Sequence, residues 1–165
     1  MIVVADSSPL IILAKLGCFD LLKRLFSRIY ISAEVSHEVV VAGAGLPGSS
    51  EVANAIWVET KKLADTAELS IALSKHPLGA GELSTILLAK QLRADAVLID
   101  DHRARTLARA EGLQISGSVG LLETFYARDY LPDLRGAFLQ LLTHNAYVDP
   151  RLLDLRLRSL GIPPL

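Results

Sequence analysis

Short apolar runs alternate with amphipathic stretches over the first 120 residues of the chain. The run at residues 2–5 is continuous rather than alternating, which is typical of a strand buried on both faces of a parallel sheet. Five runs of apolar and β-branched residues predict strands at 2–5, 28–31, 56–58, 96–99 and 113–115. Strands that alternate with helices in this way predict an α/β fold in three layers, with a central parallel sheet of about five strands flanked by helices.

The stretches between these runs predict helices, and turn residues mark several of their ends. Ser8-Pro9 is a typical helix cap followed by proline at the first helical position, and Ser32 is a second candidate cap. Helices are expected at 9–16, 18–26, 33–41, 60–78, 82–92, 102–111 and 119–126. The segment 42–50 is rich in glycine, serine and proline, which predicts a loop.

The pattern changes after residue 125. Two amphipathic stretches, 132–143 and 150–160, predict helices, and no further strand pattern follows. We therefore divide the chain into a domain at residues 1–125 and a C-terminal helical extension at residues 126–165. The extension is expected to pack on the domain or to lie at an interface.

The composition supports a folded protein and says little about its partner. Hydrophobic residues make up 51% of the chain and charged residues 21%, enough for a sizeable core with apolar surface left for a homodimer or another partner. A single cysteine excludes an internal disulfide, and no apolar run approaches the roughly 20 residues of a membrane span. These features predict a cytoplasmic protein. The net charge of −1 gives no overall sign of nucleic-acid binding.

Acidic residues stand where predicted strands end or helices begin. Asp6 follows the first strand, Glu38 lies in the helix after the second strand, and Glu82 begins the helix after a glycine-containing loop. Asp100 and Asp101 follow the fourth strand. Because the carboxyl ends of parallel strands share one edge of the sheet, we expect these side chains to converge there.

Each of these acids also has a simpler interpretation. The strand-end aspartates could cap the helices that follow them, and Glu82 could be a first-turn carboxylate favoured by the helix dipole. Glu34 lies one turn before Glu38 and could take its place. As a set, several carboxylates in one cleft raise each other's pKa values unless a cation lies among them. Oxygen ligands without a histidine or cysteine pair favour Mg²⁺ or Mn²⁺, which can activate water for attack on a phosphodiester.

Several segments together resemble the PIN domain family, and most closely its uncharacterised PIN-like group related to VapC-type toxins. The similar segments are Val4–Ile11, Ile31–Glu38, Gly81-Glu82, Leu98–Arg105 and Gly112–Leu122. The similarity covers roughly residues 1–125, and the closing helical segment also resembles the C-terminal extension of that group. The resemblance implies a PIN-like fold and a metal-dependent endoribonuclease with an acidic Mg²⁺ or Mn²⁺ site.

The resemblance also implies the members of that site. Carried over by position, its metal-binding and catalytic acids are Asp6, Glu38, Glu82 and Asp101. The family's Thr-x-Asp pattern points to Asp101, but Ile99 stands in place of the threonine, so Asp100 remains open as the metal ligand. Ser8 matches the small hydroxyl that often supports the first aspartate.

An RNA substrate requires positive charge near the acidic edge. The helix at 102–111 could supply it through Arg103, Arg105 and Arg109, although an ordinary solvated helix face is the simpler interpretation. The similarity to VapC-type toxins further implies the toxin role in a toxin–antitoxin pair, with a small antitoxin protein as partner.

Two other classes with acidic sheet edges fit poorly. A response-regulator receiver needs an acidic pair after the first strand and a lysine after the fifth, where this chain has a lone Asp6 and Ser116-Gly117. A phosphatase of the haloacid dehalogenase type needs an aspartate where Ser8 stands. The alternative that stays open is a PIN-like module that binds nucleic acid or protein with little or no nuclease activity.

Overall fold

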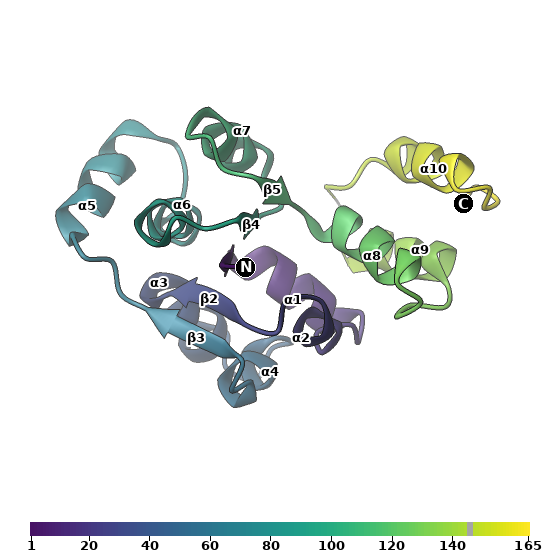
Figure 1. Cartoon of the computed structure of the whole chain (residues 1–165), viewed down its shortest axis with the longest axis horizontal. Helices are drawn as coiled ribbons and strands as arrows, with labels where there is room; N and C mark the ends of the chain where they lie inside the picture. The colour runs from purple at the N-terminus through teal and green to yellow at the C-terminus, as the bar shows by residue number, and fades with distance from the viewer. Residues whose placement is uncertain (145–146) are drawn as a thin grey trace.

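A computed structural model describes residues 1–144 and 147–165 (Figure 1). All strand pairs of its five-stranded sheet are parallel, and the strand order is β3-β2-β1-β4-β5. The strands are β1 (Val3–Ala5), β2 (Ile29–Ser32), β3 (Val58–Lys61), β4 (Ala96–Leu98) and β5 (Ile115–Ser116). The predicted α/β fold with a parallel sheet of about five strands is confirmed.

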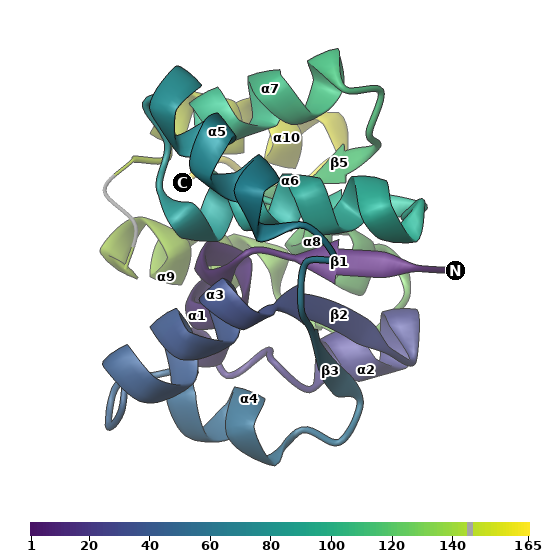
Figure 2. The same cartoon turned by 90° about the vertical axis from the view of Figure 1, so that its left-hand side faces the viewer.

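The sheet lies between two layers of helices. Neighbouring residues of a strand face opposite sides of the sheet and therefore belong to different buried clusters. Val3 and Ala5 belong to one buried cluster and Val4 to the other. The Val4 cluster is covered by α5 (Thr66–Lys75), α6 (Ala80–Leu92) and α7 (His102–Ala110). The other cluster includes residues of α1 (Ser7–Lys15), α2 (Leu21–Phe26) and α8 (Ser118–Ala127). In Figure 2, α5, α6 and α7 lie above β1, whereas α1 and α2 lie below it.

Helix α1 begins earlier than the sequence predicts. Its cap is Asp6 rather than Ser8, because the Asp6 carboxylate accepts a hydrogen bond from the Ser7 amide at 2.8 Å. Pro9 therefore lies in the first turn, where a missing N–H leaves no intrahelical bond unmade. The helix thus starts directly at the carboxyl end of the central strand.

Two segments after β2 differ from their prediction. The expected single helix is α3 (Ala33–Ser36) followed at once by the π-helix η1 (His37–Ala42). Ser32 caps α3 as expected, since its hydroxyl accepts from the Val35 amide at 3.0 Å. The expected loop leads into a helix, α4 (Ser49–Asn54). The sequence did not predict this helix, because glycine, serine and proline before it are typical of a loop.

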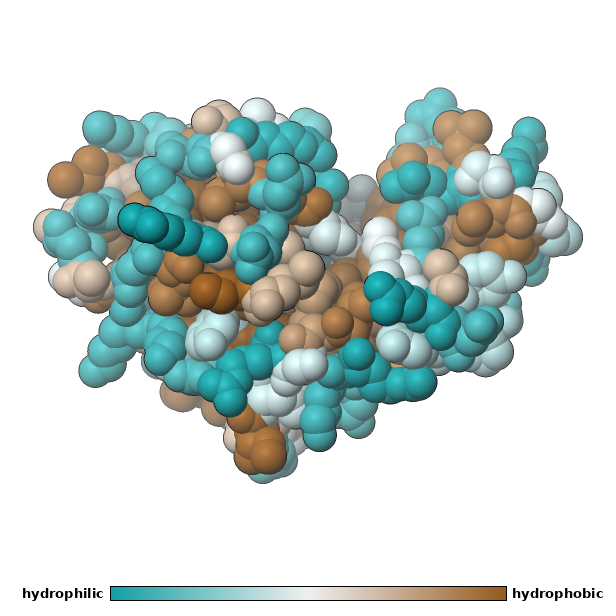
Figure 3. All heavy atoms as spheres, viewed as in Figure 1, coloured by the Kyte–Doolittle hydropathy of each residue, from teal (hydrophilic) through white to brown (hydrophobic). Residues whose placement is uncertain are grey.

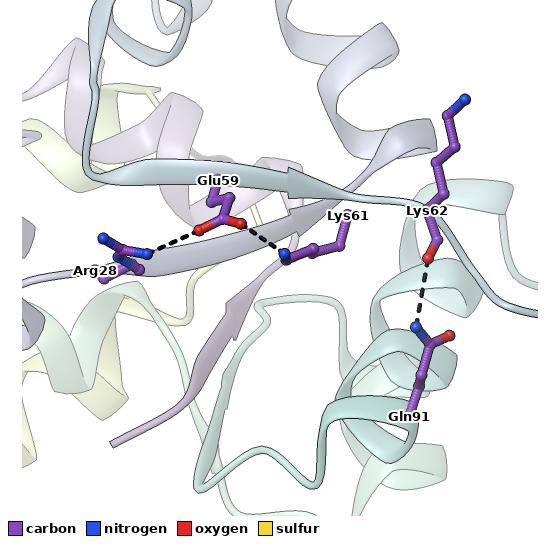
Figure 4. A network of polar contacts seen from close by, with 5 residues as sticks. All are labelled: Arg28, Glu59, Lys61, Lys62 and Gln91. Atoms are coloured by element: carbon purple, nitrogen blue, oxygen red, sulfur yellow. Dashed lines mark hydrogen bonds and ion pairs between the residues drawn. The ribbon is translucent and has the colours of Figure 1, made fainter.

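Polar contacts hold the edge strand β3 (Figure 4). Glu59 forms ion pairs with Arg28 at 3.0 Å and with Lys61 at 2.6 Å. Gln91 of α6 donates to the carbonyl of Lys62 at 3.4 Å and anchors the segment that leaves the strand. Charged side chains along an edge strand disfavour pairing with a strand of another molecule.

The C-terminal helices share the larger buried cluster. Leu134 and Phe138 of α9 (Leu134–His144) and Leu153 of α10 (Pro150–Ser159) are buried with residues of α1. The surface is hollowed between α7 and α10 (Figure 3). These helices therefore pack on the domain, and their separation as an extension starting at residue 126 stays a prediction. No helix among the described residues is long and apolar enough to cross a membrane.

Candidate functional site

Asp6 is a buried carboxylate at the carboxyl end of the central strand. Its side chain is 2% exposed, and its backbone amide donates to the Leu98 carbonyl of β4 at 2.9 Å. Burial raises the pKa of Asp6 to about 7, against the opposing effect of the hydrogen bond from Ser7. Three acidic neighbours raise this pKa further, and they are, in order of effect, Glu82, Glu38 and Asp100. The carboxylates of Glu82, Glu38 and Asp100 therefore lie near enough to Asp6 to repel its charge.

Glu38 reaches this edge from η1, next to the start of α6. A Cβ atom added to Gly81 would lie 2.6 Å from Oε2 of Glu38 and 3.5 Å from Oδ1 of Asp6. The Glu38 carboxylate thus occupies the space that a side chain at position 81 would need, and the Asp6 carboxylate lies at van der Waals distance from it. Single π-helical turns are frequent at functional sites, where they redirect side chains. Here the π-helix begins one residue before Glu38.

Buried hydroxyl groups hold Gly81 in place. The hydroxyls of Ser84 and Thr85 donate to its carbonyl at 2.9 and 2.8 Å, and the hydroxyls of Ser84 and Ser32 lie 2.7 Å apart. All three side chains are fully buried. They join the end of β2 to the first turns of α6. The hydrophobic pattern does not indicate this role, although hydroxyl residues three and four positions after a carbonyl are spaced to bond back to it.

Glu82 lies in the first turn of α6 and is half-buried. A Cβ atom on Gly79 would lie 2.8 Å from its Oε2. Glu82 contributes more than the other acids to the raised pKa of Asp6, so its carboxylate faces the same space. A first-turn carboxylate is also stabilised by the helix dipole, and the two roles are compatible here.

The two aspartates after β4 lie in different environments. Asp101 is exposed, and its side chain caps α7 by accepting from the Ala104 amide at 2.8 Å. Asp100 accepts from the amide and the hydroxyl of Ser118 at 2.7 and 2.6 Å. Asp100 also raises the pKa of Asp6. The structure thus brings Asp100 to the other carboxylates and engages Asp101 at the start of a helix.

The residues predicted to support the site or to bind RNA are more dispersed. Ser8 is half-buried, and within the described part of the chain no hydrogen bond joins its hydroxyl to Asp6. Arg103 and Arg109 are exposed on α7. Arg105 points inward, and its Nη1 donates to the Ile99 carbonyl at 3.0 Å. The three predicted arginines therefore do not form one surface.

The donor atoms at this edge suit a hard divalent cation. All four groups are carboxylates, the ligands that Mg²⁺ and Mn²⁺ prefer, and a positive charge would relieve the energetic cost of ionising Asp6. Among residues 1–144 and 147–165, no three acidic, histidine or cysteine side chains already stand close enough together to hold a metal ion. Glu38 is exposed and Glu82 half-exposed, so both have room to turn toward an ion beside Asp6.

Alanine at position 81 should separate metal binding from stability. The substitution Gly81→Ala forces the flexible end of Glu38 to move and places a good helix former at the start of α6. We expect the free energy of unfolding to change by less than about 1 kcal/mol, while Mn²⁺ affinity falls about tenfold. Calorimetric Mn²⁺ titration and urea unfolding would measure both. Gly120→Ala, a glycine within α8, is the matched control, and unchanged Mn²⁺ affinity in Gly81→Ala would contradict the placement of Glu38.

Comparison with known proteins identifies the family of the chain. The family DUF3368, described as a PIN domain, matches residues 2–161. No curated protein matches the chain. PIN domains are generally nucleases and typically use divalent metal ions, so the chain carries a nuclease-type module. The predicted similarity to the PIN family is confirmed, whereas the closer relation to VapC-type toxins stays a prediction. The chain belongs to the PIN domain family.

Proposed function

We propose that this protein is an endoribonuclease that hydrolyses RNA phosphodiester bonds with Mg²⁺ or Mn²⁺. The observation that carries the proposal is the buried carboxylate of Asp6, whose pKa is raised to about 7 by burial and by three acidic neighbours at the carboxyl edge of a PIN-domain sheet. Such a cluster is electrostatically unfavourable without a cation and becomes favourable with one.

The four acids would have different roles, which depend on the hydrogen bonds that hold each carboxylate. Asp6 and Asp100 are held by hydrogen bonds, so they would bind the ion in a defined position. Glu38 is exposed and Glu82 half-buried, and both would bind the ion directly or through water, or orient the attacking water. A bound Mg²⁺ or Mn²⁺ supplies the charge that activates water and stabilises the negative charge developing on the phosphate.

The N-termini of two helices contact Asp6 and Asp100. Asp6 caps α1, and Asp100 binds the first amide of α8 through Ser118. Each helix start offers partial positive charge to its aspartate, which offsets part of the repulsion between the acids. In this proposal, backbone amides and the Ser118 hydroxyl support the aspartates, in place of the Ser8 hydroxyl that the sequence suggested.

RNA contacts would come from exposed cations near the acidic edge. Arg103 lies in the first turn of α7, two residues after Asp101, and Arg109 lies farther along the same helix. Lys62 follows the carboxyl end of β3, and its side chain extends away from the polar contacts of that strand (Figure 4). Phosphate contacts of this kind bind RNA without reading its sequence.

A cleavage assay tests the proposal. The purified protein should cut a labelled RNA with Mn²⁺ or Mg²⁺ and lose this activity in EDTA, with a DNA of the same sequence as the comparison substrate. Metal-independent cutting would indicate a contaminating nuclease and contradict the proposal. RNA binding without cutting under every metal condition would instead favour the alternative, a PIN-like binding module.

The resemblance to VapC-type toxins supports a cellular role for such an activity. We propose that the protein is the toxin of a toxin–antitoxin pair and that a small antitoxin protein restrains it. Exposed apolar residues such as Leu152 and Leu155 of α10 would suit a protein interface, including a homodimer. Expression should arrest growth, and Asp6→Ala should relieve the arrest. Unchanged growth on expression would contradict the toxin role, and a monomer by analytical ultracentrifugation would contradict the homodimer.

A further inference from the structure

Helix α7 carries an arginine whose side chain turns inward to the backbone just after strand β4. Nη1 of Arg105 donates to the carbonyl of Ile99 at 3.0 Å. The side chain is partly buried, and this burial lowers the pKa of Arg105, whereas Arg103 and Arg109 of the same helix are exposed. Partial burial of a cation removes favourable hydration, which costs free energy. The contacts of Arg105 must offset this cost.

A glycine provides the room for this arginine and for Asp100. A Cβ atom on Gly117 would lie 2.5 Å from Nη1 of Arg105 and 2.8 Å from Oδ1 of Asp100. The backbone of Gly117 is extended, with φ −117° and ψ −178°, a conformation that any residue adopts. Space rather than backbone torsion therefore favours glycine here, because the guanidinium and the carboxylate approach the same backbone position.

Arg105 does not neutralise Asp100 by a direct ion pair. Within the described part of the chain, the ion pairs at 4.0 Å or less do not include one between these two side chains. Arg105 instead binds the carbonyl of Ile99, the residue directly before Asp100. The backbone of Asp100 is thus held from one side by Arg105, and its carboxylate from the other by Ser118. The carboxylate of Asp100 is therefore not engaged in an ion pair with Arg105.

We propose that Arg105 is a positioning residue, which fixes the end of β4 so that the carboxylate of Asp100 faces Asp6 where a divalent ion binds. The inference rests on the metal site of the proposed function and names a residue that supports it from outside. Residues that orient metal ligands typically contribute 10- to 100-fold to metal affinity. The competing role, a direct phosphate contact with RNA, leaves metal affinity unchanged.

Mn²⁺ affinity measured without RNA separates these roles. In Arg105→Met, we expect the Mn²⁺ dissociation constant to rise about tenfold, because the hydrogen bond to Ile99 is lost. Arg105→Lys should recover part of this loss, since its ammonium group is still a donor. Gly117→Ala should weaken binding as well, by displacing the guanidinium or the carboxylate. Arg158→Met, which removes an exposed arginine of α10, controls for the change in net charge. Electron paramagnetic resonance titration and thermal melting would be recorded for all variants.

The outcomes distinguish this inference from the proposed function. Unchanged or tighter Mn²⁺ binding in Arg105→Met overturns the positioning role, and weaker RNA binding in that variant would then assign Arg105 to the substrate. If Arg105→Met fails to fold, Arg105→Lys decides the question by the same titration, and a Mn²⁺ affinity equal to that of the parent overturns the positioning role. A parent protein that binds Mn²⁺ but never cuts RNA contradicts the nuclease alone. A parent that binds neither Mn²⁺ nor Mg²⁺ overturns both proposals.

Discussion

Replacing Asp6 with asparagine is expected to abolish RNA cleavage while making the metal-free protein more stable at neutral pH. The pKa of Asp6 is about 7 in the folded protein, well above the value of about 3.9 in an unfolded chain. The folded state therefore binds this proton more tightly than the unfolded state. Between about pH 4 and pH 7, the contribution of Asp6 to stability falls as the pH rises, and above pH 7 the loss is complete.

Urea unfolding of both proteins at several pH values in EDTA would measure this effect. The parent should lose on the order of a few kcal/mol relative to Asp6→Asn between pH 5 and pH 8. Asparagine is also a good helix cap, so α1 should keep its start in the variant. Added Mn²⁺ should stabilise the parent and leave the variant unchanged. An Asp6→Asn variant that is less stable than the parent at pH 8, or that still cuts RNA, would contradict the account.

The second large effect concerns the two aspartates after β4. Asp100→Asn is expected to lower the cleavage rate at least a hundredfold, because it removes a charged ligand beside Asp6. Asp101→Asn should retain most of the activity, since asparagine can still accept the hydrogen bond from the Ala104 amide that starts α7. Asp101→Ala should lose about 1 kcal/mol of stability with the cap, but not the activity.

Single-turnover cleavage rates and thermal melting of the three variants would test this assignment. The two asparagine variants serve as controls for each other, because they change the same charge at adjacent positions. If Asp101→Asn were inactive and Asp100→Asn active, the Thr-x-Asp alignment would be correct and the assignment from the geometry wrong.

The sequence predicted the fold because its signals were local. The run at 2–5 indicated a buried strand, and strand β1 with Asp6 at its end lies where expected. The third strand begins at Val58 rather than at residue 56, because the amide of Val58 turns back to the carbonyl of Ala55 at 3.0 Å. The hydrophobic pattern alone does not indicate such a turn.

The geometry of the site depends on contacts between distant segments. The Thr-x-Asp pattern points to Asp101, whereas in the structure Ser118, eighteen residues after Asp100, orients Asp100. Gly81 leaves space for the carboxylate of Glu38, and Gly117 leaves space for Asp100 and Arg105, which sequence spacing alone does not indicate. The sequence predicts one role, RNA binding, for Arg105 and for two arginines that prove exposed. Helical spacing does not indicate that the guanidinium of Arg105 binds the Ile99 carbonyl.

Anomalous diffraction from crystals grown with Mn²⁺ tests the central claim, that these carboxylates form one metal site. We expect an anomalous peak at the carboxyl edge of the sheet, bound by Asp6 and Asp100, with Glu38 and Glu82 in contact directly or through water. The peak should disappear in Asp6→Asn crystals. A peak bound by Asp101 without Asp6, or no peak at this edge at a saturating Mn²⁺ concentration, would contradict the account.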